Sequence, residues 1–136
     1  MKKYLLSIGI ALLATSVFAQ QKSSQFVLII RSKGDIRASP ETIKINIAHW
    51  TAWMTDLGRH GKIAAGYRFP TEGTTIIKAD GDAKPGAYIA NGELVSSFLI
   101  INAADLNEAK QIAAKCPTFE LGGTVEVRAV QNTATN

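Results

Sequence analysis

Side chains that could move a proton are concentrated in the stretch NIAHWTAWMTDLGRHGK, residues 46–62. His49 and His60 are the two histidines of the sequence, and a histidine exchanges protons near neutral pH because its ordinary pKa is about 6.5. Asp56 precedes His60 by one helical turn, a spacing at which two side chains meet. Trp53 adds a flat apolar ring on which a ligand could stack. We therefore treat His49 as a candidate general acid or base, with local packing at a helix border as the alternative.

Two arginines on neighbouring strands could supply an anion-binding pair. Arg31 follows the first apolar run, and Arg68 lies in the second predicted strand. If His49 lines a cleft, both arginines could point into it. Strand ends in solvent would explain these arginines equally simply. Trp53 has a similar alternative, because a half-buried tryptophan at a subunit edge is common. We predict Trp53, Arg31 and Arg68 as substrate-binding candidates.

Metal and cofactor chemistry find little support in the residue spacings. Histidine and cysteine pairs at HxxxH, HxH or CxxC spacing are missing, and His49 and His60 are too far apart on one helix to share an ion. The glycine-rich segment 81–93 lacks the spacing of a phosphate-binding loop. Cys116 stands alone, which rules out an intrachain disulfide and is typical of a small buried residue. We expect no metal and no cofactor.

The candidate residues need a helix to position them. Ser39 is suited to an N-cap, Pro40 to the first helical position and Glu41 to the first turn, and the helix should end near Gly58 to Gly61. Five apolar residues at helical spacing predict the buried stripe: Ile43, Ile47, Trp50, Met54 and Leu57. At about 100° per residue, a second stripe lies roughly 80° to 140° to one side: His49, Trp53, Asp56 and His60. Such an edge stripe can line a cleft.

The remaining elements predict a ferredoxin-like α+β fold. Apolar runs and turn residues predict strands at 26–30, 63–69, 74–79, 94–101 and 123–130, a long excursion at 80–93 with a short strand at 87–89, and a second helix at 104–115. Leu106, Ala109, Ile112 and Ala113 should face inward from that helix. This order matches a split βαβ sandwich, in which two helices cover one face of an antiparallel sheet.

The second face of that sheet also needs cover. The runs FVLII (26–30) and FLII (98–101) are apolar on both faces, which is typical of strands buried on both sides. Because two helices cover only one face, we expect a homodimer in which two sheets pack face to face as a dimeric α/β barrel.

The N-terminal segment has the features of a secretory signal peptide. Lys2 and Lys3 precede a short apolar run, and Val17 and Ala19 occupy the positions that a signal peptidase prefers. We therefore predict a signal peptide at 1–19, a polar leader at 20–25, one domain at 26–130 and a disordered tail at 131–136. No later stretch is long and apolar enough to span a membrane. The protein should be exported, and periplasmic or secreted.

The charge balance excludes one class of partner. The sequence holds 15 basic residues, two of them in the predicted signal peptide, against 11 acidic residues. The basic residues that remain are scattered rather than clustered, so the chain lacks the electrostatic footprint of a nucleic-acid-binding protein.

Several of these motifs together resemble the YCII-related family. The resemblance runs from about Phe26 to Val130 and is carried by FVLII, HWTAWMTDLGRHGK followed by GYRF, FLIINAADLNEAKQIAAKCP and GTVEVRAV. It implies a dimeric α/β barrel of the ferredoxin-like group, and His49 matches the family's candidate active-site histidine. Relatives often pair that histidine with an aspartate before a proline, where this chain has Cys116, and the DGPF motif of some members is missing.

Two functions follow from the residues and the resemblance. The first is an exported small-molecule enzyme in which His49 acts as general acid or base. The second is a non-catalytic domain that keeps the family scaffold and binds a small molecule or a protein. The altered motifs favour the second function, and the position of His49 favours the first.

Overall fold

The structure is a computed structural model and describes residues 23–131. The predicted signal peptide at 1–19 and residues 132–136 of the predicted tail lie outside the described residues. The main elements are β1 (Ser24–Lys33), α1 (Pro40–Arg59), β2 (Ile63–Arg68), β6 (Glu93–Ala103), α2 (Leu106–Ala113), the 3-10 helix η1 (Pro117–Leu121) and β7 (Thr124–Ala129). Three short strands lie between β2 and β6: β3 (Thr74–Ile76), β4 (Ala83–Pro85) and β5 (Ile89–Ala90).

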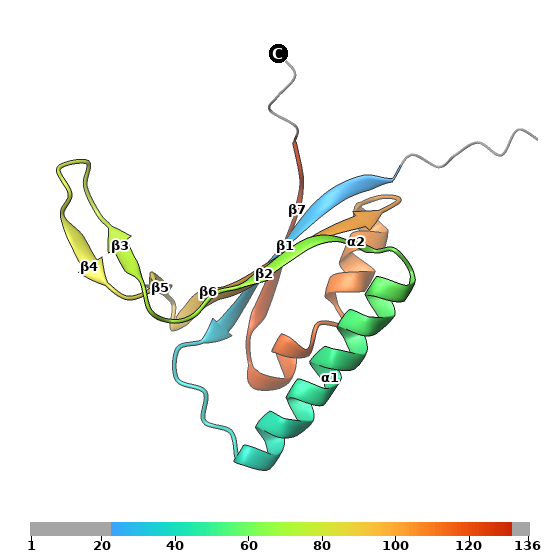
Figure 1. Cartoon of the computed structure of the whole chain (residues 1–136), viewed down its shortest axis with the longest axis horizontal. Coiled ribbons are helices and arrows are strands. Elements are labelled where there is room, and N and C mark those ends of the chain that lie inside the picture. The colour runs from blue at the N-terminus through green and yellow to red at the C-terminus, as the bar shows by residue number, and fades with distance from the viewer. Residues whose placement is uncertain (1–22, 132–136) are drawn as a thin grey trace, which may run out of the picture.

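The main sheet has the predicted ferredoxin-like arrangement. Its strands run antiparallel in the order β2-β6-β1-β7, and β5 pairs with the start of β6. Both helices lie on one side of the sheet (Figure 1), and their inward side chains join those of β1 and β6 in one core. The α+β fold is therefore confirmed. Within residues 23–131, no helix is long and apolar enough to cross a membrane.

Strand β1 shows why the two faces of the sheet differ. Its side chains alternate, so Phe26, Leu28 and Ile30 face the helices and are buried, whereas Val27 and Ile29 face the other way and are only half-buried. In the single chain the helices cover one face only, and burial of the other face by a second copy stays a prediction.

Helix α1 begins and ends where its capping residues predict. The backbone N–H of Thr42 donates to Ser39 Oγ at 3.1 Å, Pro40 opens the helix, and Glu41 lies in its first turn. The last helical residue is Arg59, and His60 is the C-cap. Local residue chemistry is sufficient to set both ends.

The predicted stripe of α1 is confirmed toward the end of the helix, where Leu57 is buried and Trp50 and Met54 pack against the core, and is wrong at its start. Ile43 and Ile47 are 39% and 59% exposed, whereas Asn46, Trp53 and Leu57 are buried. The buried stripe is rotated by about 60° from the prediction, at about 100° per residue. The cause is η1, which packs on α1 and gives polar partners to Asn46, so that an amide rather than an isoleucine points inward.

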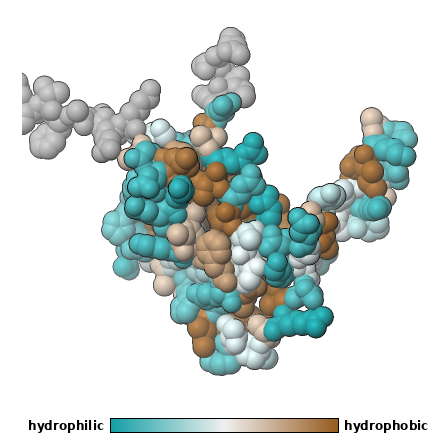
Figure 2. Space-filling view, turned by 180° about the vertical axis from the view of Figure 1, so that it is seen from behind, coloured by the Kyte–Doolittle hydropathy of each residue, from teal (hydrophilic) through white to brown (hydrophobic). Residues whose placement is uncertain are grey.

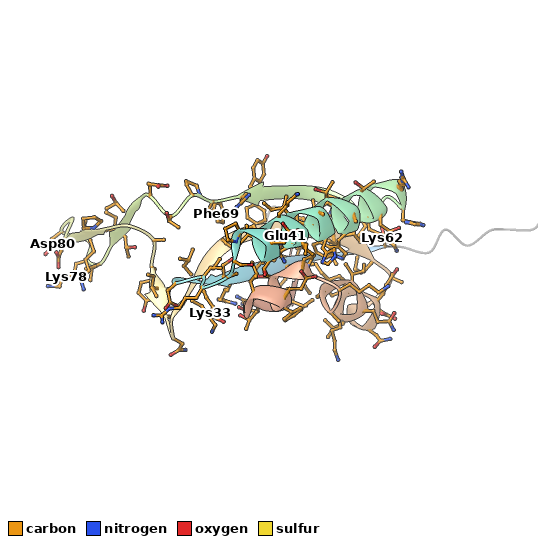
Figure 3. All side chains as sticks on the ribbon, turned by 90° about the horizontal axis from the view of Figure 1, so that it is seen from below. Lys33, Glu41, Lys62, Phe69, Lys78 and Asp80 are labelled. Carbon is orange, nitrogen blue, oxygen red and sulfur yellow. The ribbon has the colours of Figure 1, made fainter. Side chains whose placement is uncertain are left out.

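The predicted third strand belongs to a projecting arm. Only Thr74–Ile76 is extended there, and it pairs with Ala83–Pro85 in a separate two-stranded sheet instead of joining the main one. We call residues 69–92 the arm; it projects from the sheet (Figure 1) and carries hydrophobic side chains in the open (Figure 2). Lys78 and Asp80 lie at its tip and Phe69 at its base (Figure 3). The short strand of the excursion is Ile89–Ala90 rather than 87–89.

The C-terminal half adds one element that was not predicted. Helix α2 is shorter than predicted at both ends, with Asp105 as its N-cap, and it buries Ala109 and Ala113. Leu106 is exposed instead of facing inward, because it is the first residue of the helix. The turn after α2 forms η1, which ends at Gly122 with a φ of 78°, a conformation that favours glycine.

Candidate functional site

The contact between α1 and η1 gives His49 an acidic partner. His49 Nδ1 lies 2.8 Å from Glu120 Oε1. Glu120 belongs to η1, which starts at Pro117 and packs against α1. The contact joins residues far apart in the sequence, and it exists because the 3-10 turn carries Glu120 back across the helix.

Asn46 holds the other side of the same carboxylate. It lies one helical turn before His49, so both side chains project from the same side of α1. Asn46 Nδ2 donates to Glu120 Oε2 at 2.8 Å and to the backbone carbonyl of Pro117 at 2.8 Å. Asn46 is 5% exposed, and both amide hydrogens are used. We call Asn46, His49 and Glu120 the α1–η1 site.

Hydrogen bonds keep the carboxylate of the site ionised. The bond from Asn46 lowers the pKa of Glu120 most, and the bond from His49 lowers it further, against the opposing effect of burial. At neutral pH Glu120 is therefore an acceptor only. His49 Nδ1 must carry the proton in this contact, which leaves Nε2 as the proton-exchanging atom of the neutral ring.

The exposure of His49 suits proton exchange with a small molecule. Its side chain is 53% exposed, so a molecule from solvent can reach the ring. A hollow of about 410 Å³ lies beside the site and shares Glu120 with it; residues 36–39, Thr42 and Leu121 form the rest of its wall. Arg37 is the basic residue of this wall. The arrangement can orient an imidazole and leave its outer nitrogen accessible.

Trp53 does not line an open cleft. It is 8% exposed and belongs to the core, with its ring centroid 5.6 Å from that of Trp50 in an edge-to-face pair. Its Nε1 is buried and has no hydrogen-bond partner among the described residues. Trp53 therefore packs the helix onto the sheet and does not stand at the predicted edge.

The two predicted arginines are not brought to His49. Arg31 donates to Glu126 Oε2 at 2.7 Å, and the alternation of β1 turns Arg31 to the face away from the helices. Arg68 is exposed at the end of β2, the edge strand, and forms no ion pair among the described residues. The single chain therefore does not bring His49, Arg31 and Arg68 into one cleft.

Cys116 and His60 have structural surroundings. Burial raises the pKa of the Cys116 thiol to about 11, so the thiol stays protonated and is a poor nucleophile. His60 Nδ1 lies 2.8 Å from the backbone carbonyl of Asp56 and 3.4 Å from Asp56 Oδ1, so the two residues meet one turn apart as predicted, mainly through the backbone. Both partners of that pair are well exposed. Residues 23–131 contain no group of three side chains placed to hold a metal ion.

Sequence reasoning missed Glu120 and Asn46. Glu120 lies four residues after Cys116, the position at which the resemblance implies an acid, and η1 carries it back to His49. Asn46 carried no signal by itself, because a single asparagine on a helix is usually exposed. The signal in the sequence is the acidic residue three positions after Pro117, which the short turn brings back toward α1.

The chain was compared with curated proteins and with solved structures. None of the curated proteins matches the chain. One similar solved structure is 5-chloro-2-hydroxyhydroquinone dehydrochlorinase from Burkholderia phenoliruptrix AC1100 in complex with 2,5-dihydroxybenzoquinone, with 19% identity, a TM-score of 0.43, and coverage of 82% of this chain and 98% of that chain. Another is a de novo designed protein with a ferredoxin fold, with 9% identity, a TM-score of 0.34, and coverage of 84% of this chain and 89% of the designed one.

The comparison with protein families is specific. The family described as the YCII-related domain matches residues 24–133, which is most of the chain and spans every strand and helix described above. The match contains both halves of the α1–η1 site. The chain belongs to the YCII-related domain family.

Proposed function

We propose that this protein is an exported small-molecule enzyme in which His49 is the general acid or base. The observation that carries the proposal is the 2.8 Å contact between His49 Nδ1 and Glu120 Oε1. An ionised carboxylate on Nδ1 fixes the ring orientation and the tautomer, which is what a proton-transferring histidine requires. Export is supported by the signal-peptide features of Met1–Ala19.

The proton path follows from the hydrogen bonds. With Nδ1–H donated to Glu120, the lone pair of Nε2 takes a proton from the substrate, and the ring becomes an imidazolium beside the Glu120 carboxylate. The same Nε2–H then donates the proton to the substrate atom that is protonated in the product, and the ring is neutral again. The substrate is a small molecule whose reacting atom approaches Nε2 from solvent, where the His49 side chain is 53% exposed.

A ligand screen followed by matched histidine variants tests this function. Small molecules that raise the melting temperature of the wild-type protein are incubated with it, and turnover is followed by mass spectrometry. His49→Gln should keep the fold and lose about 10²- to 10⁴-fold in turnover. His60→Gln is the matched control, because it removes the other histidine of the same helix and should leave turnover unchanged. Turnover that survives His49→Gln would contradict the proposal.

One observation favours a non-catalytic binding domain as the second candidate. The α1–η1 site is open, with the side chain of His49 about half exposed, and catalytic sites usually exclude water more fully. If the screen yields ligands that bind with no turnover by the wild-type protein, this second function is the better one.

We further propose that the protein is a homodimer formed through the open sheet face. The face away from the helices carries Val27, Ile29, Phe98 and Ile100, half-buried in the single chain. Phe98 also contacts Tyr67 and Phe69, with ring centroids 5.6 and 5.8 Å apart. Contiguous apolar surface of this kind favours association. Light scattering should give the mass of two chains, and Phe98→Glu should halve it; a monomeric wild-type protein would contradict the dimer.

A further inference from the structure

We infer that Asn46 is a positioning residue, which sets where Glu120 stands and thereby which nitrogen of His49 carries the proton. This inference rests on the proposed function, since it assigns a role within the same site. It concerns a residue that touches neither a substrate nor the proton-exchanging nitrogen. Its evidence is geometric and comes from three contacts around one carboxylate.

The orientation of the Asn46 amide follows from its partners. The atom that faces Glu120 Oε2 and the Pro117 carbonyl must be the nitrogen, because both partners are acceptors at 2.8 Å. A flipped amide would set Oδ1 against two oxygens. The two hydrogens of one NH₂ group thus bridge a side chain and the backbone of η1.

This bridge divides the carboxylate of Glu120 between two donors. Oε2 is taken by Asn46 and Oε1 by His49, so rotation of the carboxylate would break both bonds at once. The bond to the Pro117 carbonyl fixes the first residue of η1 to the same amide. Asn46 therefore fixes Glu120 both through its side chain and through the helix that carries it.

The residue type is the one this position requires. An aspartate at 46 would face two acceptors without a proton to donate, and a leucine would leave both acceptors without their donor. Burying an unbonded amide is costly, and Asn46 is 5% exposed, so both of its hydrogen bonds are needed for the residue to lie there. The lowered pKa of Glu120, for which the Asn46 bond is the largest cause, agrees with this geometry.

Nuclear magnetic resonance of the full chain tests the inference without any substrate. Imidazole ¹⁵N shifts report the tautomer of neutral His49, and the side-chain ¹³C shift of Glu120 reports its titration. We expect the Nδ1–H tautomer in the wild-type protein. In Asn46→Leu and Asn46→Asp, the ring should shift toward the Nε2–H tautomer, and the titration midpoint of Glu120 should rise. Asn102→Ala is the matched control, because Asn102 Nδ2 donates to the carbonyl of Gly61 outside the site.

A folded Asn46→Leu protein that keeps the wild-type tautomer and Glu120 midpoint would overturn the inference. If neither variant folds, the wild-type protein still decides, since the Asn46 side-chain amide signals should move with the Glu120 titration. Amide signals that do not follow it would overturn the inference as well.

The outcome is separable from that of the proposed function. A tautomer that depends on Asn46, together with turnover that survives His49→Gln, would support the positioning role and reject the catalytic one. The reverse pair of results would reject only the positioning role.

Discussion

His49 lies within α1 and His60 is its C-cap, and the Nδ1 atom of each lies close to an acidic residue, yet the two contacts are built differently. His60 pairs with Asp56 one turn earlier on α1, and both side chains are well exposed. His49 pairs with Glu120 from another element, and buried Asn46 holds the same carboxylate. The first pair is a local consequence of helical spacing, whereas the second depends on tertiary packing. The comparison teaches that proximity to an acid is not by itself a site.

The largest expected effect tests whether packing in the middle of α1 is what holds its buried face in place. Trp53→Ala should lower the free energy of unfolding by about 3–5 kcal/mol, because it empties a large volume in the core. Trp53→Phe should cost only about 1 kcal/mol, since it also removes the buried N–H that lacks a partner. Urea unfolding measures both, and a loss for Trp53→Phe as large as that for Trp53→Ala would contradict the account in which filled volume is what Trp53 contributes.

The next effect concerns the polar contact between α1 and η1. Asn46→Leu should lower the free energy of unfolding by about 1–3 kcal/mol, because the Pro117 carbonyl and Glu120 lose their donor. Asn102→Ala, which removes an exposed side-chain bond, should cost less. Chemical unfolding of both proteins makes the comparison. An Asn46→Leu protein with an unchanged free energy of unfolding would show that these hydrogen bonds do not stabilise the contact between α1 and η1.

A pH series tests the role of the Glu120 carboxylate, the acid that contacts His49. The pKa of Glu120 is lowered in the folded protein below its ordinary value of 4.5, so its contribution is fully present above pH 4.5. That contribution is lost as the pH falls through the folded-state pKa. The difference in unfolding free energy between the wild type and Glu120→Gln should therefore narrow below pH 4.5. A difference that stays constant from pH 7 to pH 3 would contradict this account.

The smallest effect belongs to the local pair. Asp56→Ala should change the free energy of unfolding by less than about 0.5 kcal/mol, because exposed ion pairs within one helix contribute little. The ¹⁵N shifts of His49 should not move in this variant. A large loss of stability would contradict this account, because it would mean that Asp56 stabilises more of the fold than the last turn of α1.

Sequence reasoning succeeded where the cause is local. Ser39, Pro40 and Gly61, which follows the C-cap with a φ of 64°, set the ends of α1 by cap chemistry that acts within a few residues. The alternation of the strands and their order similarly predicted the ferredoxin-like sheet.

It failed where a distant element decides. Apolar spacing favoured Ile43 and Ile47 for the buried face, but η1 gives Asn46 two hydrogen-bond acceptors. The spacing of apolar residues carries no information about such acceptors on a distant element. The partner of His49 was missed for the same reason, since it lies 71 positions away in the chain. The run at 74–79 was read as a sheet strand, although a β3–β4 pairing within the arm was equally open to it.

The arm has a consequence for how this domain can change over time. It leaves after β2 and returns at β5, which pairs directly with the start of β6, so both of its ends are anchored to the main sheet. Segments between such fixed points tolerate insertion and deletion well. The domain can therefore gain, lose or exchange this appendage while the register of its four long strands, and the α1–η1 site on the helix-covered face, are inherited intact.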